Sequence, residues 1–211
     1  MKYILSALAN TRTNRGRLIV IEGIDGAGKS TLQRGLAEDL RARGRTVVCT
    51  KEPTDGPLGR QIRALAARGR DSVSAEEELA LFHEDRRQHV QAVVRPALER
   101  GEIVIQDRSF HSTVAYQGER GLDRDRLWSQ SLEIAPLPDL LLVVDLPAEV
   151  ALERIRRSRA GTDDFERLES LRRIRSTFLG FPGASVLDGT LAPADLLDAA
   201  KAMLPPVISQ L

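Results

Sequence analysis

Four residues near the start of the chain have the types and the spacing needed to hold a chain of phosphates. Gly23, Gly28, Lys29 and Ser30 fit the pattern Gly-x4-Gly-Lys-Ser. Glycines let backbone N–H groups approach phosphate oxygens closely. The lysine can neutralise the phosphate that is transferred, and the serine hydroxyl can ligate Mg²⁺. The alternative is a glycine-rich turn that binds nothing.

The residues on either side of this loop predict the elements that would position it. Residues 18–21 are apolar and are expected to form a buried strand, and residues 31–43 are expected to form a helix. This strand-loop-helix context is the one that a P-loop requires, and it favours phosphate binding over an empty turn. The helix would also direct the positive end of its dipole at the bound anion.

The rest of the chain continues to alternate between short apolar runs and longer amphipathic segments. Ser74 and Glu77 have the spacing of a capping box, which predicts the start of a long helix. We therefore expect an α/β protein with the P-loop NTPase fold, a five-stranded parallel sheet, helices on both faces and a short arginine-rich lid. The further strands are expected at 45–50, 102–106, 140–144 and 184–187, and the further helices at 58–67, 74–100, 109–118, 126–134, 147–157, 165–179 and 193–203.

Charged residues follow several of these strands. Ligands of open α/β sheets bind at the carboxyl ends of the strands, so these positions are candidates for a site. Glu52 and Asp55 follow the second strand, and either a substrate contact or a solvated loop fits them. Asp107 could hold Mg²⁺ and Arg108 could clamp a phosphate, while an ion pair that caps the next helix is the alternative. Asp145 ends the fourth strand and competes with Asp107 for the metal.

Composition limits the classes of protein that remain. A length of 211 residues suits one α/β domain, expected over 17–211, with 1–16 as a flexible N-terminal extension. The net charge of +1 argues against nucleic acid and anionic membranes as partners. No apolar stretch approaches the ~20 residues of a membrane span. The single cysteine, Cys49, excludes an internal disulfide, and its apolar surroundings predict a buried thiol in a reducing compartment.

Arginines cluster just before a Gly-Thr break in the last third of the chain. They are Arg154, Arg156, Arg157 and Arg159. A mobile lid over about 156–164 could bring one of them onto a transferring phosphate. A solvated basic helix face is the alternative.

Together these motifs resemble thymidylate kinases, within the P-loop nucleoside-monophosphate kinase group. The matching segments are IEGIDGAGKST at 21–31, EPTDGPLGRQIR at 52–63, LALFHEDR at 79–86, DRSFHSTVAYQG at 107–118, VVDLP at 143–147 and the arginine-rich segment that runs into DDFE. The resemblance implies ATP-dependent phosphorylation of dTMP to dTDP with Mg²⁺, in a cytoplasmic homodimer. Kinases for another nucleoside monophosphate or a nucleoside, and a non-kinase P-loop regulator, are the alternatives.

The resemblance also assigns roles to residues. Phe82 would stack on thymine, Arg86 would contact the base, and Tyr116 would lie close to the sugar. The ATP-binding set would be Gly23, Ile24, Asp25, Gly26, Ala27, Gly28, Lys29, Ser30 and Thr31. The acceptor set would be Asp25, Glu52, Phe82, Arg86, Arg108, Ser112, Thr113, Tyr116 and Gln117. The metal would be held by Ser30 and Asp107, and the catalytic set would be Lys29, Arg108, Arg157 and Arg159.

Two positions depart from the family pattern. Ser109 replaces the aromatic residue that usually follows the Asp-Arg pair. Asp164 stands where the lid commonly carries an arginine, which leaves Arg157 and Arg159 as the lid candidates. Gly26 occupies a P-loop position where some members carry arginine, so a lid arginine is needed for charge neutralisation.

Overall fold

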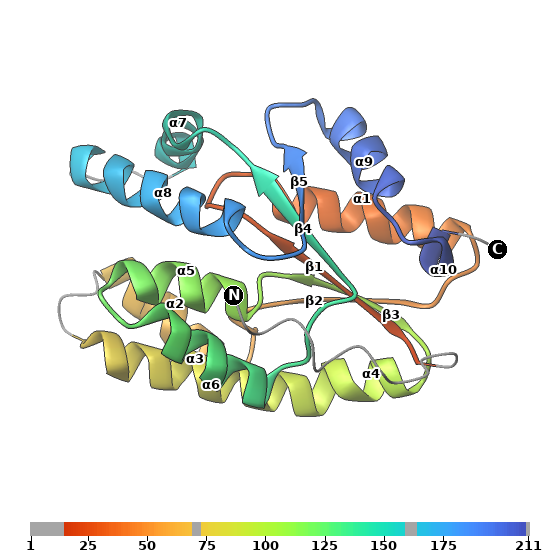
Figure 1. Cartoon of the computed structure of the whole chain (residues 1–211), viewed down its shortest axis with the longest axis horizontal. Coiled ribbons are helices and arrows are strands. Elements are labelled where there is room, and N and C mark those ends of the chain that lie inside the picture. Colours follow the sequence, from red (N-terminus) through yellow and green to blue (C-terminus); the bar gives the residue numbers. More distant parts are fainter. Residues whose placement is uncertain (1–14, 69–72, 159–163, 210–211) are drawn as a thin grey trace.

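A five-stranded parallel sheet forms the centre of the fold, as predicted (Figure 1). The computed structural model describes residues 15–68, 73–158 and 164–209. The strands pair in the order β2-β3-β1-β4-β5. Their bounds are Arg17–Glu22 for β1, Val47–Lys51 for β2, Ile103–Asp107 for β3, Leu140–Asp145 for β4 and Ala184–Asp188 for β5.

Helices cover both faces of this sheet (Figure 1). On one face, α1 and α9 pack together, and α1 contacts β1, β2 and β3. On the other, α4 contacts β3, α8 contacts β4, and α5 packs against α3, α6 and α8. The bounds are Lys29–Ala42 for α1, Pro57–Arg68 for α2, Ala75–His89 for α3, Arg95–Glu99 for α4, Phe110–Glu119 for α5, Arg124–Ile134 for α6, Ala148–Ser158 for α7, Asp164–Leu179 for α8, Pro193–Ala202 for α9 and Pro206–Ser209 for α10.

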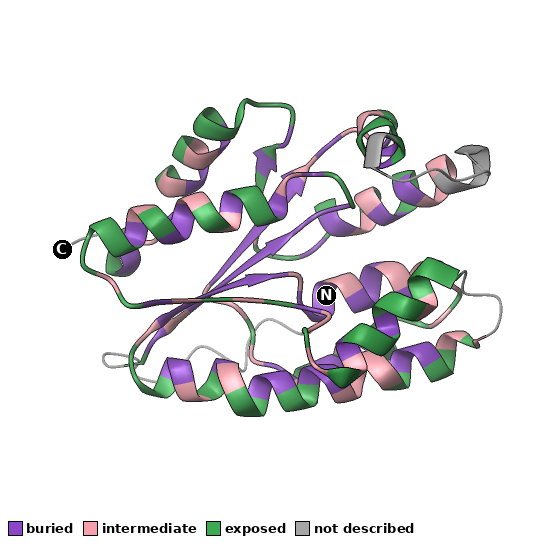
Figure 2. Ribbon diagram, turned by 180° about the vertical axis from the view of Figure 1, so that it is seen from behind, coloured by how far each residue is buried: buried purple, intermediate pink, exposed green. Residues whose placement is uncertain are grey.

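The central strands β1, β3 and β4 are almost entirely buried, whereas β2 is not (Figure 2). All five residues of β3 are buried, which is typical of a parallel strand with helices on both faces. At the sheet edge, β2 has only Val47 fully buried. The prediction of a buried Cys49 thiol is therefore wrong, because Cys49 lies on this edge strand and is exposed.

The long helix predicted over 74–100 is present, but it contains an irregular turn. Ser74 Oγ accepts from the Glu77 N–H at 3.2 Å, and Glu77 Oε2 accepts from the Ser74 N–H at 2.9 Å. This confirms the capping box. A π-helical turn, η1 (Val90–Val94), joins α3 to α4 just before Pro96. Proline cannot donate to the carbonyl four residues earlier, so a local change of helix type next to it is expected.

The C-terminal region adds one element that the sequence did not predict. The helix α10 starts at Pro206, because proline ends many helices but is favoured in the first turn of a new one.

Trp128 packs between Phe110 and Phe181, with ring centroids 5.2 and 5.8 Å away. Among the described residues no helix is long and apolar enough to cross a bilayer.

Most of the predicted N-terminal extension, and most of the predicted lid over 156–164, lie outside the described residues. Gly16 is described and is buried, and its N–H donates to the Leu98 carbonyl at 2.8 Å.

The capping box should contribute measurably to stability without touching the site. Ser74→Ala removes the acceptor for the Glu77 N–H, so the free energy of unfolding should fall by about 1 kcal/mol. Urea unfolding measures this. Ser129→Ala is the matched control, because the Ser129 hydroxyl bonds only a carbonyl within α6, and it should have a smaller effect. An equal loss in the two variants would contradict the assignment.

Candidate active site

The glycine loop lies at the carboxyl edge of the sheet, between β1 and α1. Gly23 has a φ of 140°, and a Cβ there would come within 2.5 Å of the Val144 carbonyl oxygen, so only glycine fits. Lys29 is buried, and its Nζ donates to the Ile24 carbonyl at 2.9 Å. Burial, together with the nearby Arg108, lowers the pKa of Lys29 to about 8. The loop thus surrounds a lysine that is held at the floor of the site.

The register of the sheet brings this loop beside the end of β3. Ile21 pairs with Asp107, and the Ser30 hydroxyl donates to Asp107 Oδ2 at 2.5 Å. The two predicted metal ligands therefore lie side by side. Asp145, the competing candidate, instead forms a bidentate ion pair with Arg175 on α8, with distances of 2.5 and 2.8 Å. The geometry favours Asp107 for a metal.

Arg108 lies between the glycine loop and α5. Its Nη2 donates to Asp25 Oδ1 at 2.5 Å, and its Nη1 donates to Ser112 Oγ at 2.8 Å. Its guanidinium carbon lies 5.3 Å from the centre of the Tyr116 ring, and burial raises the pKa of Tyr116 to about 12. Arg108 also lines a cavity of about 450 Å³ together with Lys29, Ser30 and Asp107. The positive charges of Lys29 and Arg108 suit this cavity to phosphate groups.

A second, smaller cavity of about 150 Å³ adjoins the first, and Arg108 and Asp25 line both. It brings together all nine residues of the predicted acceptor set, from four segments of the chain. They are Asp25, Glu52, Phe82, Arg86, Arg108, Ser112, Thr113, Tyr116 and Gln117. Residues far apart in the sequence thus meet in one compartment next to the first cavity.

Two side chains in this second cavity are buried with polar atoms left over. Arg86 is 1% exposed; its Nε donates to Glu52 Oε2 at 2.8 Å and its Nη2 donates to Thr113 Oγ1 at 2.9 Å. Within the described residues, Arg86 Nη1 and Gln117 Oε1 have no hydrogen-bond partner. Buried polar groups are normally paired. Both residues line the second cavity, so a ligand that offers an acceptor and a donor suits it.

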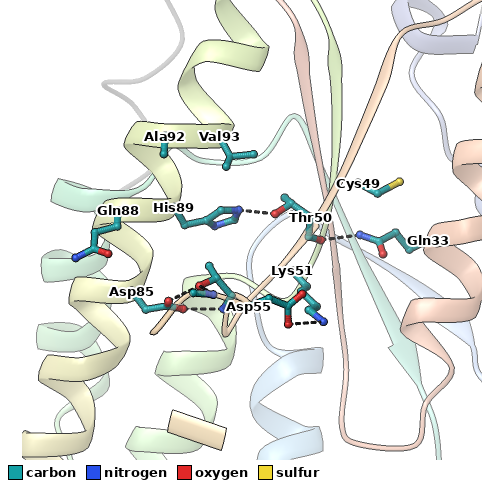
Figure 3. A pocket seen from close by; sticks show the side chains of 12 residues that line it. Gln33, Cys49, Thr50, Lys51, Asp55, Asp85, Gln88, His89, Ala92 and Val93 are labelled. Atoms are coloured by element: carbon teal, nitrogen blue, oxygen red, sulfur yellow. Dashed lines mark hydrogen bonds and ion pairs between the residues drawn. The ribbon is translucent and has the colours of Figure 1, made fainter. Parts of the chain in front are cut away.

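His89 supports this arrangement, although no sequence motif indicated it. Its Nδ1 lies 3.0 Å from Glu52 Oε1. Its Nε2 lies 2.6 Å from Thr50 Oγ1, a contact that Figure 3 shows. We assign the Nδ1 proton to the bond with Glu52, because a carboxylate can only accept. The available signal was its position, one helical turn after Arg86 on α3.

The charge of Glu52 follows from these neighbours. Burial alone would raise the pKa of Glu52, but Arg86 and His89 together hold it below its ordinary value. The carboxylate therefore stays ionised and orients the Arg86 guanidinium. His89 also lines a third cavity, of about 460 Å³, together with Thr50, Asp85 and Gln88 (Figure 3).

Arg63 is a further cavity residue that sequence reasoning missed. It lines both the phosphate cavity and the acceptor cavity, and it donates to the Pro53 carbonyl at 2.9 Å. Asp55, by contrast, is exposed and pairs with Lys51 and Arg63. The lid candidates cannot be placed in the same way, because the Arg157 side chain and Arg159 lie outside the described residues.

His89 should matter more for stability than the other histidine of α3. His89→Leu removes the partner of the buried Glu52 Oε1 and of the partly buried Thr50 hydroxyl, so the free energy of unfolding should fall by about 1–3 kcal/mol. His83→Leu is the matched control, because His83 Nε2 has no hydrogen-bond partner within the described residues. Chemical unfolding of both variants decides: an equal or larger loss for His83→Leu would contradict the proposed network.

Comparison with known proteins agrees with this geometry. The family model described as "Thymidylate kinase" matches residues 21–185. A thymidylate kinase of Xanthomonas campestris pv. campestris (strain B100) is 49% identical over 91% of this chain and 84% of its own length. Another, from Xylella fastidiosa (strain 9a5c), is 45% identical over 90% of this chain and 91% of its own length. The match spans both cavities, and the chain belongs to the thymidylate kinase family.

Proposed function

We propose that this chain transfers the γ-phosphate of ATP to dTMP and so forms ADP and dTDP. The observation that carries the proposal is the pair of adjoining cavities, one lined by the P-loop and the other by the nine acceptor residues. Family membership and the name of the relatives support the same reaction. A P-loop regulator without an acceptor would have no use for the second cavity.

On the donor side, the loop would hold the ATP phosphates through its backbone N–H groups and the start of α1. Lys29 would neutralise charge on the transferred phosphate from the floor of the site, where low water content strengthens its field. Gly26 offers no charged side chain at its position. An arginine from the lid, Arg157 or Arg159, would supply the missing cation when the lid closes.

On the acceptor side, Arg108 would bind the phosphate of dTMP. The attacking oxygen is already anionic, so no strong general base is needed. Arg108 and the Asp25 carboxylate that holds it would align this oxygen with the γ-phosphate, and alignment is the main catalytic contribution in such a transfer. Closing the site would also keep water from competing as the acceptor.

The base would occupy the remaining part of the acceptor cavity. Arg86 Nη1 can donate to a thymine carbonyl, and Gln117 Oε1 can accept from the ring N–H. The Phe82 ring would stack on the base, and Tyr116 would disfavour a 2′-hydroxyl on the sugar. These groups distinguish a pyrimidine deoxynucleotide from a purine nucleotide.

Mg²⁺ would be held by Ser30 and Asp107. Their oxygens lie 2.5 Å apart and suit a hard cation. Water and the substrate phosphates would complete the coordination of the ion, as is usual for Mg²⁺. When bound, the ion neutralises charge on the phosphates. A homodimer and a cytoplasmic location are further parts of this proposal, carried by the family resemblance.

An ADP-release assay tests the acceptor directly. With ATP and Mg²⁺ present, dTMP should stimulate ADP release more strongly than dUMP, UMP, CMP, AMP or GMP, and excess EDTA should abolish the rate. Absence of stimulation by any monophosphate would contradict the kinase. A highest rate with UMP or CMP would replace dTMP as the acceptor.

Lys29 should contribute to turnover and not to folding. The lowered pKa of Lys29 reflects burial, which disfavours the charged form, so Lys29→Met should leave the melting temperature unchanged or higher. The same change removes a positive charge from the transferred phosphate and should reduce kcat by about 100-fold or more. Lys201→Met is the control, because Lys201 pairs with Asp198 on α9 away from both cavities. If Lys29→Met kept wild-type turnover, Lys29 would not lie at the phosphates.

A further inference from the structure

A buried carboxylate, Glu22, lies beneath Arg108 at the point where β1 meets the glycine loop. Its side chain is fully buried. Oε1 accepts from the backbone N–H groups of Ser109 at 2.7 Å and Ser112 at 3.1 Å, and Oε2 accepts from the Ser112 hydroxyl at 2.7 Å. Burial raises the pKa of Glu22. Burial of an ionisable group lowers the stability of the fold, so the position of Glu22 requires a physical explanation.

These contacts make Glu22 the cap of α5. The helix begins after Ser109, whose own side chain makes no capping hydrogen bond, and its first turn contains no acidic residue. Glu22 instead supplies an anion to N–H groups at the start of the helix, and it does so from a different element, β1. It therefore fixes α5, which carries Ser112 and Tyr116, to the strand that leads into the glycine loop.

The backbone of Arg108 is held in an unusual conformation at the same place. Its φ is 68°. Within the described ranges 15–68, 73–158 and 164–209, Arg108 is the only non-glycine residue with a positive φ. The Arg108 N–H donates to the Ile21 carbonyl at 2.9 Å, and the Arg108 carbonyl accepts from Gln106 Nε2 at 2.9 Å. Such backbone strain persists only where the surroundings enforce it, and it concentrates at functional sites.

Ser112 links the two features. Its hydroxyl accepts from Arg108 Nη1 at 2.8 Å and donates to Glu22 Oε2. Glu22 Oε2 itself lies 4.0 Å from Arg108 Nη1, so its charge also attracts the guanidinium. The hydroxyl can serve both partners only while Glu22 accepts its proton. Loss of the carboxylate would therefore remove the partner that orients the Ser112 hydroxyl, and the Arg108 guanidinium would be held mainly by Asp25.

We propose that Glu22 is a positioning residue that fixes the Arg108 guanidinium against the acceptor phosphate, acting through Ser112 and the start of α5. It touches no substrate. The inference rests on the proposed function, in which Arg108 binds the dTMP phosphate. Because Glu22 immediately precedes the glycine loop, one carboxylate sets the distance between the donor loop and the acceptor cation.

The test is the kinetics of Glu22→Gln, which keeps the size of the side chain and removes one acceptor and the charge. The kcat/KM for dTMP should fall by about 100-fold, because misplacement of a catalytic group by about 1 Å has this effect. The KM for ATP should stay within about twofold, since the glycine loop keeps its own contacts. Asp139→Asn is the matched control. Asp139 also accepts a hydrogen bond from a backbone N–H, that of Leu18 at 2.9 Å, but it lies at the amino ends of the strands, away from the site. The Asp139→Asn variant should keep wild-type kcat and KM values.

A double-mutant cycle separates positioning from general damage. In an Arg108→Ala background, Glu22→Gln should change kcat/KM for dTMP by less than about twofold, because the group it positions is already gone. Should Glu22→Gln fail to fold, Ser112→Ala interrupts the same link with a smaller change and should show the same selective loss for dTMP.

Three results would overturn the inference: wild-type kinetics in a folded Glu22→Gln variant, equal losses for ATP and dTMP, or a full loss that persists without Arg108. A wild-type chain that phosphorylates no monophosphate would instead contradict the proposed function itself.

Discussion

The register between β1 and β3 is the constraint on which the site depends. Pairing of Ile21 with Asp107 places the start of the glycine loop and the Asp-Arg pair at the same height on the sheet. From this pairing follow the 2.5 Å contact of Ser30 with Asp107 and the 2.5 Å ion pair of Asp25 with Arg108. A shift of β3 by one residue against β1 would turn the side chains of Asp107 and Arg108 to the opposite faces of the sheet. The donor and acceptor halves of the cleft are thus joined through the backbone of its two central strands.

Buried charge is the second theme, and it costs stability. Arg86 and Glu52 are almost fully buried, and such pairs recover their desolvation penalty only with good geometry and further hydrogen bonds. His89 and Thr113 supply those bonds here. Arg86 Nη1 is buried without a hydrogen-bond partner among the described residues, and Arg86 lines the acceptor cavity. Burial of this donor lowers the stability of the protein, but it leaves a fixed group that can recognise the polar edge of a base.

Local patterns predicted the elements well, and long-range pairing limited what could be predicted. Apolar runs and glycine or proline breaks are local signals, so the strands were predicted to within two residues. The exposure of Cys49 was missed, because it depends on β2 lying at the sheet edge. Motif spacing was enough to select Lys29, Ser30, Asp107 and Arg108, whereas Phe82 and Gln117 needed the family resemblance. Neither signal indicated Glu22 or His89, since their partners lie on other elements, up to 90 residues away in the sequence.

The central claim is that ATP and dTMP meet across Arg108 in one continuous cleft, and binding of a bisubstrate molecule tests it most directly. A compound that joins adenosine to thymidine through a chain of phosphates should occupy both cavities at once. Calorimetric titration should show it binding at least about 100-fold more tightly than dTMP alone, because the second half binds intramolecularly. Arg108→Ala should remove most of this gain. A bisubstrate compound that binds no more tightly than its separate halves would contradict the account.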